Sequence, residues 1–108
     1  MKYKYPNPVL IVGNPYTVTF VNASSVDEES STGCSRHDLL EIRISTKTVE
    51  GKERHILWIE KTLWHELIHS IAKVFSLDIG ESAVEGLSQG VSQILTDAGF
   101  HLVTEETE

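Results

Sequence analysis

The chain has little of several features that define specialised classes of protein. It holds a single cysteine, Cys34, so no disulfide can form within its 108 residues. Nine basic residues stand against sixteen acidic ones, the net charge is −7, and Lys and Arg do not cluster, which argues against nucleic acid and anionic membranes as partners. The apolar run 9–12, bounded by Pro8 and Gly13, is too short for a signal-peptide core or a membrane span. We therefore expect a cytoplasmic protein.

The composition is that of an ordinary globular domain. Apolar residues make up 40% of the chain and charged residues 23%, which is too apolar for a disordered chain. A chain of this length has room for one core and buries about two-thirds of the surface that it exposes when unfolded. The sequence predicts a single domain over residues 1–108.

The first half of the chain carries strand signals. Two short β-prone runs, 9–12 and 17–21, are separated by the turn-forming residues Gly-Asn-Pro-Tyr, which predicts strands or a hairpin within 1–21. Residues 22–38 are polar, acidic and serine-rich, and we expect them to form a mobile loop. Residues 39–45 alternate strictly between apolar and polar side chains, which predicts a strand with one face on the core.

The second half of the chain is helical in pattern. Apolar residues recur every three or four positions over 53–75, and no proline or glycine interrupts them. A second helix is predicted over 79–98, where Asp78 and Glu81 have the spacing of a capping box and Gly99 is a stop signal. Its buried face is predicted to comprise Val84, Leu87, Val91, Ile94 and Leu95. The predicted fold class is therefore α+β.

The motif HExxH lies in the middle of the first predicted helix, as His65, Glu66 and His69. Residues four apart project from one helix face, so both imidazoles can bind a single ion. Zinc binds neutral imidazole readily and, with three protein ligands, keeps a fourth position for water. Glu66 lies beside this position and is suited to take a proton from the water as general base. The pattern predicts a zinc site with Glu66 as the catalytic residue.

A third ligand is needed, and the sequence offers two carboxylates on the second helix. The extended motif HExxHxxGxxH is absent, and no other histidine has diagnostic spacing: His37, His55 and His101. If the second helix returns antiparallel to the first, residue 85 lies near the level of His69. Glu81 lies about a turn closer to the bend and is also the expected capping-box partner. We therefore predict Glu85 as the third ligand and keep Glu81 as the alternative.

Two histidines followed by a glutamate on the next helix resemble the gluzincin metallopeptidases. The chain is most similar to the small metallopeptidase-like proteins encoded by phages and mobile elements, over about residues 39 to 98. The resemblance implies a minimal zincin-like fold, with a small N-terminal sheet packed on the HExxH helix and an antiparallel second helix. It also implies that 39–45 is an edge strand that pairs with an extended substrate.

These patterns lead to a functional hypothesis and its rivals. The first is a zinc-dependent peptidase that hydrolyses an intracellular protein or peptide substrate. The alternative is a non-catalytic zincin-like module that binds zinc or a partner protein, and a weaker third is a helical accessory protein without a metal. Trp58 and Trp64, which flank the motif, are expected to pack in the core or along the cleft wall.

Overall fold

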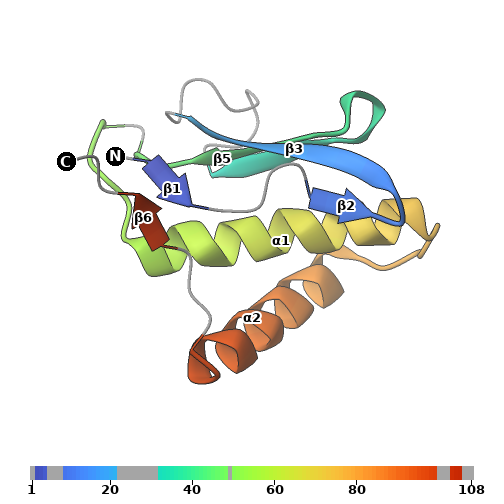
Figure 1. The fold of residues 1–108 in the computed structure, drawn as a ribbon. Coiled ribbons are helices and arrows are strands. Elements are labelled where there is room, and N and C mark those ends of the chain that lie inside the picture. The colour runs from blue at the N-terminus through green and yellow to red at the C-terminus, as the bar shows by residue number, and fades with distance from the viewer. Residues whose placement is uncertain (1, 5–8, 22–31, 49, 100–102, 106–108) are drawn as a thin grey trace.

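The computed structural model describes residues 2–4, 9–21, 32–48, 50–99 and 103–105 (Figure 1). The elements are β1 (Lys2–Lys4), β2 (Val9–Ile11), β3 (Asn14–Val21), β4 (Gly33–Arg36), β5 (Glu41–Ser45), α1 (Ile56–Val74), α2 (Glu81–Asp97) and β6 (Val103–Glu105). Helix α1 lies between the sheet on one side and α2 on the other (Figure 1). The predicted α+β class is confirmed.

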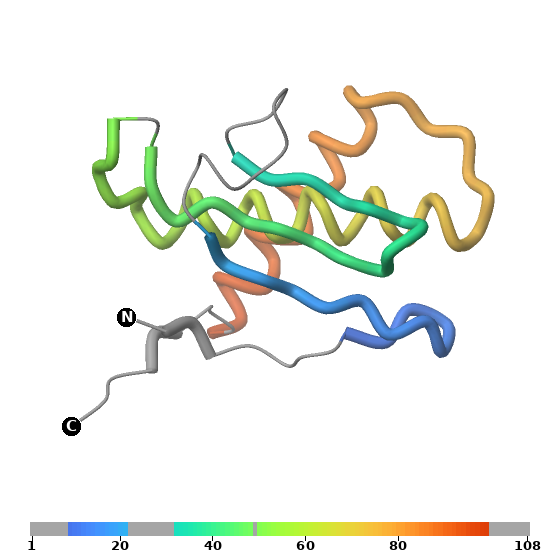
Figure 2. The backbone as a smooth tube through the Cα atoms, turned by 90° about the horizontal axis from the view of Figure 1, so that it is seen from above, coloured from blue at the N-terminus to red at the C-terminus, as the bar shows by residue number. Residues whose placement is uncertain are grey.

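The main sheet has four strands in the order β2-β3-β5-β4 (Figure 2). Strands β2 and β3 form an antiparallel hairpin, β3 and β5 pair in parallel, and β4 pairs antiparallel with β5. Strands β1 and β6 form a separate antiparallel pair that joins the two ends of the chain. The hairpin turns at Val12 and Gly13, which both have positive φ angles, 50° and 82°. Positive φ at both central residues is the geometry of a tight primed turn.

Two predictions in the first half of the chain are wrong. The predicted strand 39–45 is not at the sheet edge, because its observed part β5 lies between β3 and β4. The predicted loop over 22–38 contains the edge strand β4, followed by a 3₁₀ turn at His37–Leu39. Strand β4 has few apolar side chains. It is held in the sheet by backbone pairing with β5 and by contact with α1. Residues 22–31 lie outside the described residues.

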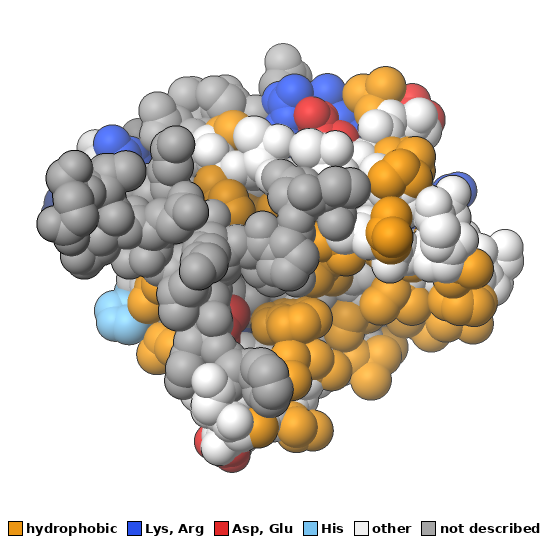
Figure 3. All heavy atoms as spheres, in the orientation of Figure 1, with side chains coloured by type: hydrophobic (Ala, Val, Ile, Leu, Met, Phe, Trp, Pro, Cys, Tyr) orange, Lys and Arg blue, Asp and Glu red, His pale blue; other side chains and the backbone are white. Residues whose placement is uncertain are grey.

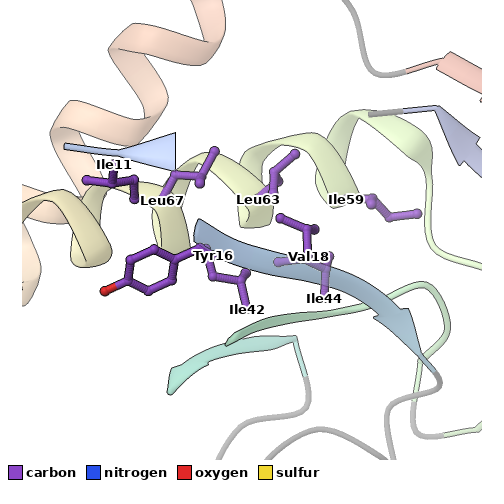
Figure 4. Close-up of a cluster of buried hydrophobic side chains, with 8 residues drawn as sticks. All are labelled: Ile11, Tyr16, Val18, Ile42, Ile44, Ile59, Leu63 and Leu67. Atoms are coloured by element: carbon purple, nitrogen blue, oxygen red, sulfur yellow. The ribbon is translucent and has the colours of Figure 1, made fainter. Parts of the chain in front are cut away.

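The hydrophobic core lies between the sheet and α1 (Figure 4). It is built from alternate residues of the strands and from one stripe of the helix. The cluster consists of Ile11, Tyr16, Val18, Ile42, Ile44, Ile59, Leu63 and Leu67. This packing fixes α1 against the sheet, so the opposite face of α1 is left for α2.

Both predicted helices form, with later starts than their patterns indicated. Helix α1 begins at Ile56, and the Nδ1 atom of its N-cap residue His55 accepts a hydrogen bond from a backbone N–H. Helix α2 has Gly80 as its N-cap with no side-chain hydrogen bond, so the predicted capping box of Asp78 and Glu81 does not form. The predicted stop is confirmed: Gly99 follows the end of α2 with a φ of 88°.

Helix α2 returns along α1 in the opposite direction, at an oblique angle (Figures 1 and 2). Its buried residues are Val84, Ser88 and Ser92. The predicted buried positions Leu87 and Ile94 are instead 51% and 68% exposed. The serines share the buried face of α2 with Val84, so the larger residues Leu87 and Ile94 lie on its exposed face. Hydrophobic side chains are accordingly exposed over the two helices (Figure 3). Within the described residues, neither helix combines the length and apolar character needed to cross a bilayer.

Gly33 allows β4 to lie directly against α1. A Cβ atom at this position would lie 2.8 Å from Cγ2 of Thr62 and 3.1 Å from the backbone oxygen of Arg43. The Thr62 side chain is held in place, because its hydroxyl accepts from Arg54 at 2.7 Å and donates to the Trp58 carbonyl at 2.9 Å. We expect Gly33→Ala to lower the free energy of unfolding by about 1–3 kcal/mol, measured by urea denaturation.

The matched control is Gly86→Ala, in the middle of α2. Nothing lies within 4 Å of a Cβ atom built there. Alanine is favoured over glycine inside a helix, so this change is expected to raise the free energy of unfolding by about 0.5–1 kcal/mol. Stabilisation by both substitutions would contradict the close contact of β4 with α1.

Candidate metal centre

The face of α1 that is turned toward α2 carries His65 and His69. The two rings lie one turn apart, with centroids 4.8 Å from each other, and their Nε2 atoms are separated by 3.2 Å. Their neighbours Leu63 and Leu67 are buried on the sheet side of the same helix. The amphipathic pattern of α1 therefore places both imidazoles, half-buried, between the helices.

Glu81, the first residue of α2, completes a group of three potential ligands. Its Oε1 atom lies 2.6 Å from Nε2 of His65, and its Oε2 atom lies 3.1 Å from Nε2 of His69. The donor atoms of the three residues all lie within 4.8 Å of one another. Around a tetrahedral zinc ion with bonds of about 2.0–2.1 Å, neighbouring donors lie about 3.3 Å apart. The separations of 3.1 and 3.2 Å are close to this value, the contact of 2.6 Å is shorter, and the donor set of two nitrogens and one oxygen is one that zinc accepts.

Glu85 contacts the other side of the His65 ring. Its Oε2 atom lies 2.9 Å from Nδ1 of His65. The carboxylate is therefore placed to accept a hydrogen bond from Nδ1, an arrangement that orients the ring in known metal sites. The amide of Gln89 donates to Glu85 at 2.8 Å and is the main cause that lowers the pKa of Glu85, with His65 adding to it.

The geometry favours Glu81 over the predicted third ligand, Glu85. The prediction discounted Glu81 as a capping-box partner, but its side chain is free of that role because the cap is at Gly80. The turn between the helices also extends to residue 80, so the first turn of α2 lies at the level of the histidines. Glu85 is left in the position of an orienting partner.

Glu66 lines the same cavity as the three candidate ligands and does not join their group. Its side chain is 8% exposed, and it points toward β4, where the Ser35 hydroxyl donates to its Oε1 atom at 2.8 Å. Burial raises the pKa of Glu66, although the hydrogen bond from Ser35 and the charges of the two histidines oppose this rise. A carboxylate with a raised pKa holds a proton more readily, which suits a general base. Sequence reasoning missed Ser35, because no periodic pattern distinguishes it within its serine-rich segment.

A cavity of about 470 Å³ opens over the group. It is lined by the candidate ligands and Glu66 on one side and by Gly33 of β4 on another. Trp58, 61% exposed, also lines the cavity, and the ammonium of Lys61 lies 4.6 Å from the centroid of the Trp58 ring. Trp58 thus lies along the wall of the cleft, whereas Trp64 packs against the core. Both positions are among those expected for the two tryptophans.

Among the described residues, the other two histidines and the cysteine do not join this group. The Nδ1 atom of His37 lies near the Tyr16 hydroxyl, and His55 caps α1. Cys34 is a free, half-buried thiol on β4. His101 lies outside the described residues.

No protein-family profile, curated protein or solved structure matches the chain. The case for a function therefore depends on the side-chain geometry together with the resemblance of the motif.

Proposed function

We propose that the protein is a zinc-dependent peptidase. In this proposal His65, His69 and Glu81 bind zinc, Glu66 is the general base, and Glu85 orients His65. The observation that supports it most is the convergence of two imidazole nitrogens and a carboxylate, with the buried Glu66 carboxylate lining the same cavity outside that group. A purely structural zinc site has no need for this additional buried carboxylate.

The chemistry assigned to the chain is proton transfer during hydrolysis. When bound, zinc acts as a Lewis acid and lowers the pKa of water to about 7. Glu66 accepts a proton from the attacking water as the new C–O bond forms. The same carboxyl group then gives the proton to the departing amine as the C–N bond breaks. Ser35 holds Glu66 in the orientation that this transfer requires.

An extended peptide is the substrate class that suits this cleft. Among the strands that the structure describes, β4 has only β5 as a neighbour, so one edge of β4 has no strand partner there. Such an edge binds an extended chain through main-chain hydrogen bonds. The proposed target is an intracellular protein, in keeping with the resemblance to phage-encoded metallopeptidases.

Metal content is the direct test of the centre. Protein purified without added metal is expected to hold about one zinc ion per chain, measured by elemental analysis, and to cleave members of a mixed peptide pool. His65→Ala is expected to lose the zinc and the cleavage together. His55→Ala, which removes a helix cap but no ligand, should keep both. A wild-type chain that takes up no zinc on titration would refute the proposal.

A further inference from the structure

A second cavity, of about 690 Å³, lies beyond the end of β4. Its lining includes Arg36 and Lys73, neither of which forms an ion pair in the part of the chain that the structure describes. Asp38 is the one acidic residue among the described residues that line it. In a chain of net charge −7, a cavity whose described lining has two basic residues and one acidic residue differs from the rest of the molecule in its charge balance.

Uncharged polar groups complete this basic cavity. Tyr16 is 1% exposed, and its hydroxyl points away from the apolar cluster and lies 3.4 Å from Nδ1 of His37 (Figure 4). Burial lowers the pKa of His37, and the nearby ammonium of Lys73 lowers it further. The cavity thus combines cationic side chains with a hydroxyl and an imidazole, which together suit a small anion.

The basic cavity is connected to the candidate metal centre by β4. Gly33, at the start of the strand, lines the cavity over the metal group, and Ser35, which binds Glu66, lines the basic cavity. The strand runs along the sheet edge in the same direction as α1 (Figure 2). From Gly33 to Arg36 the strand rises about 10 Å, which is about three residues of an extended peptide.

We propose that the basic cavity binds a carboxylate of the substrate, two to four residues from the bond that is cleaved. This inference rests on the proposed peptidase function and specifies its substrate as an acidic peptide. Arg36 and Lys73 supply the positive charge. With Asp38, the charged residues of the described lining sum to about +1, which matches a carboxylate better than a doubly charged phosphate. The carboxylate comes from an acidic side chain or from the peptide's C-terminus.

The test measures binding to the full zinc-loaded chain carrying Glu66→Gln, so that the probes are not consumed. The probes are acetylated tetrapeptides of three alanines followed by Glu or Gln, each with a free or an amidated C-terminus. Binding is followed by NMR at the amides of residues 35–37. A probe with a carboxylate is expected to bind about three- to tenfold more tightly than its neutral match. The amidated Glu probe reports a side-chain carboxylate, and the free-acid Gln probe a C-terminal one.

Charge-matched variants show whether the preference for a carboxylate arises in the basic cavity. In the double variant Arg36→Gln with Lys73→Gln, the preference for a carboxylate is expected to disappear. The control removes the same charge elsewhere, through Lys47→Gln with Lys52→Gln, and should keep the preference. Equal binding of acidic and neutral probes, or a preference that survives in the cavity variant, would overturn the inference. Inorganic phosphate that shifts these amides when neither carboxylate does would overturn it as well.

Cleavage of a peptide library by the wild-type chain separates this inference from the proposed function. Hydrolysis with no enrichment of acidic residues near the cleaved bond would refute the role of the basic cavity alone. Carboxylate binding in the cavity without hydrolysis of any peptide would refute the peptidase and, with it, the substrate assignment, but would leave the anion site itself established.

Discussion

Replacing Glu66 with Gln is expected to lower the rate of peptide hydrolysis by about 10²–10⁴-fold while zinc stays bound. The amide has nearly the same shape as the carboxylate and still accepts the hydrogen bond from Ser35, so the fold and the three ligands should be undisturbed. What is lost is the ability to take a proton from water. The measurement is the initial rate on a peptide that the wild type cleaves, together with zinc content.

The control for this substitution is Glu53→Gln, which makes the same chemical change at an exposed residue before α1. It should leave both hydrolysis and zinc content unchanged. Full activity in Glu66→Gln would show that another group is the base. If the wild type binds zinc and hydrolyses nothing, the non-catalytic zinc-binding module becomes the better account of the chain.

Local patterns in the sequence predicted the scaffold of the site. The spacing of apolar residues in α1 determines which face packs on the sheet. Ile59, Leu63 and Leu67 of this pattern are buried there, whereas Ile71, which the same pattern places in the core, is 41% exposed. The same periodicity places His65 and His69 together on the other face. These features depend on residues within a few turns of one another, so the sequence alone carries them.

Features that depend on contacts between distant segments were not predicted. Strand β4 has no alternating apolar pattern, and it is ordered by pairing with β5 and by the fit of Gly33 against Thr62. Ser35 becomes a partner of Glu66 only through this pairing. The orientation of α2 was also missed, because Ser88 faces inward where a hydrophobic side chain was expected. Burial of serine depends on how closely two helices approach, and the sequence of one helix does not determine this.

The sequence predicts Glu85 as the third ligand, whereas the geometry favours Glu81. The zinc affinities of variants at the two positions distinguish these assignments. Glu85→Gln is expected to weaken zinc binding by about 10–100-fold, because it removes an orienting partner of His65. Glu81→Gln should weaken it by more than this, since it removes one of three ligands and leaves two imidazoles. The measurement is a competitive titration against a chromophoric chelator.

Asp97→Asn, at the far end of α2, is the charge-matched control and should leave zinc affinity unchanged. A larger loss in Glu85→Gln than in Glu81→Gln would restore the ligand set predicted from the sequence. That result would require the second helix to move, because Glu85 now contacts Nδ1 of His65 while Nε2 faces His69. The order of the two affinities therefore tests both the identity of the ligand and the position of α2 in the zinc-bound protein.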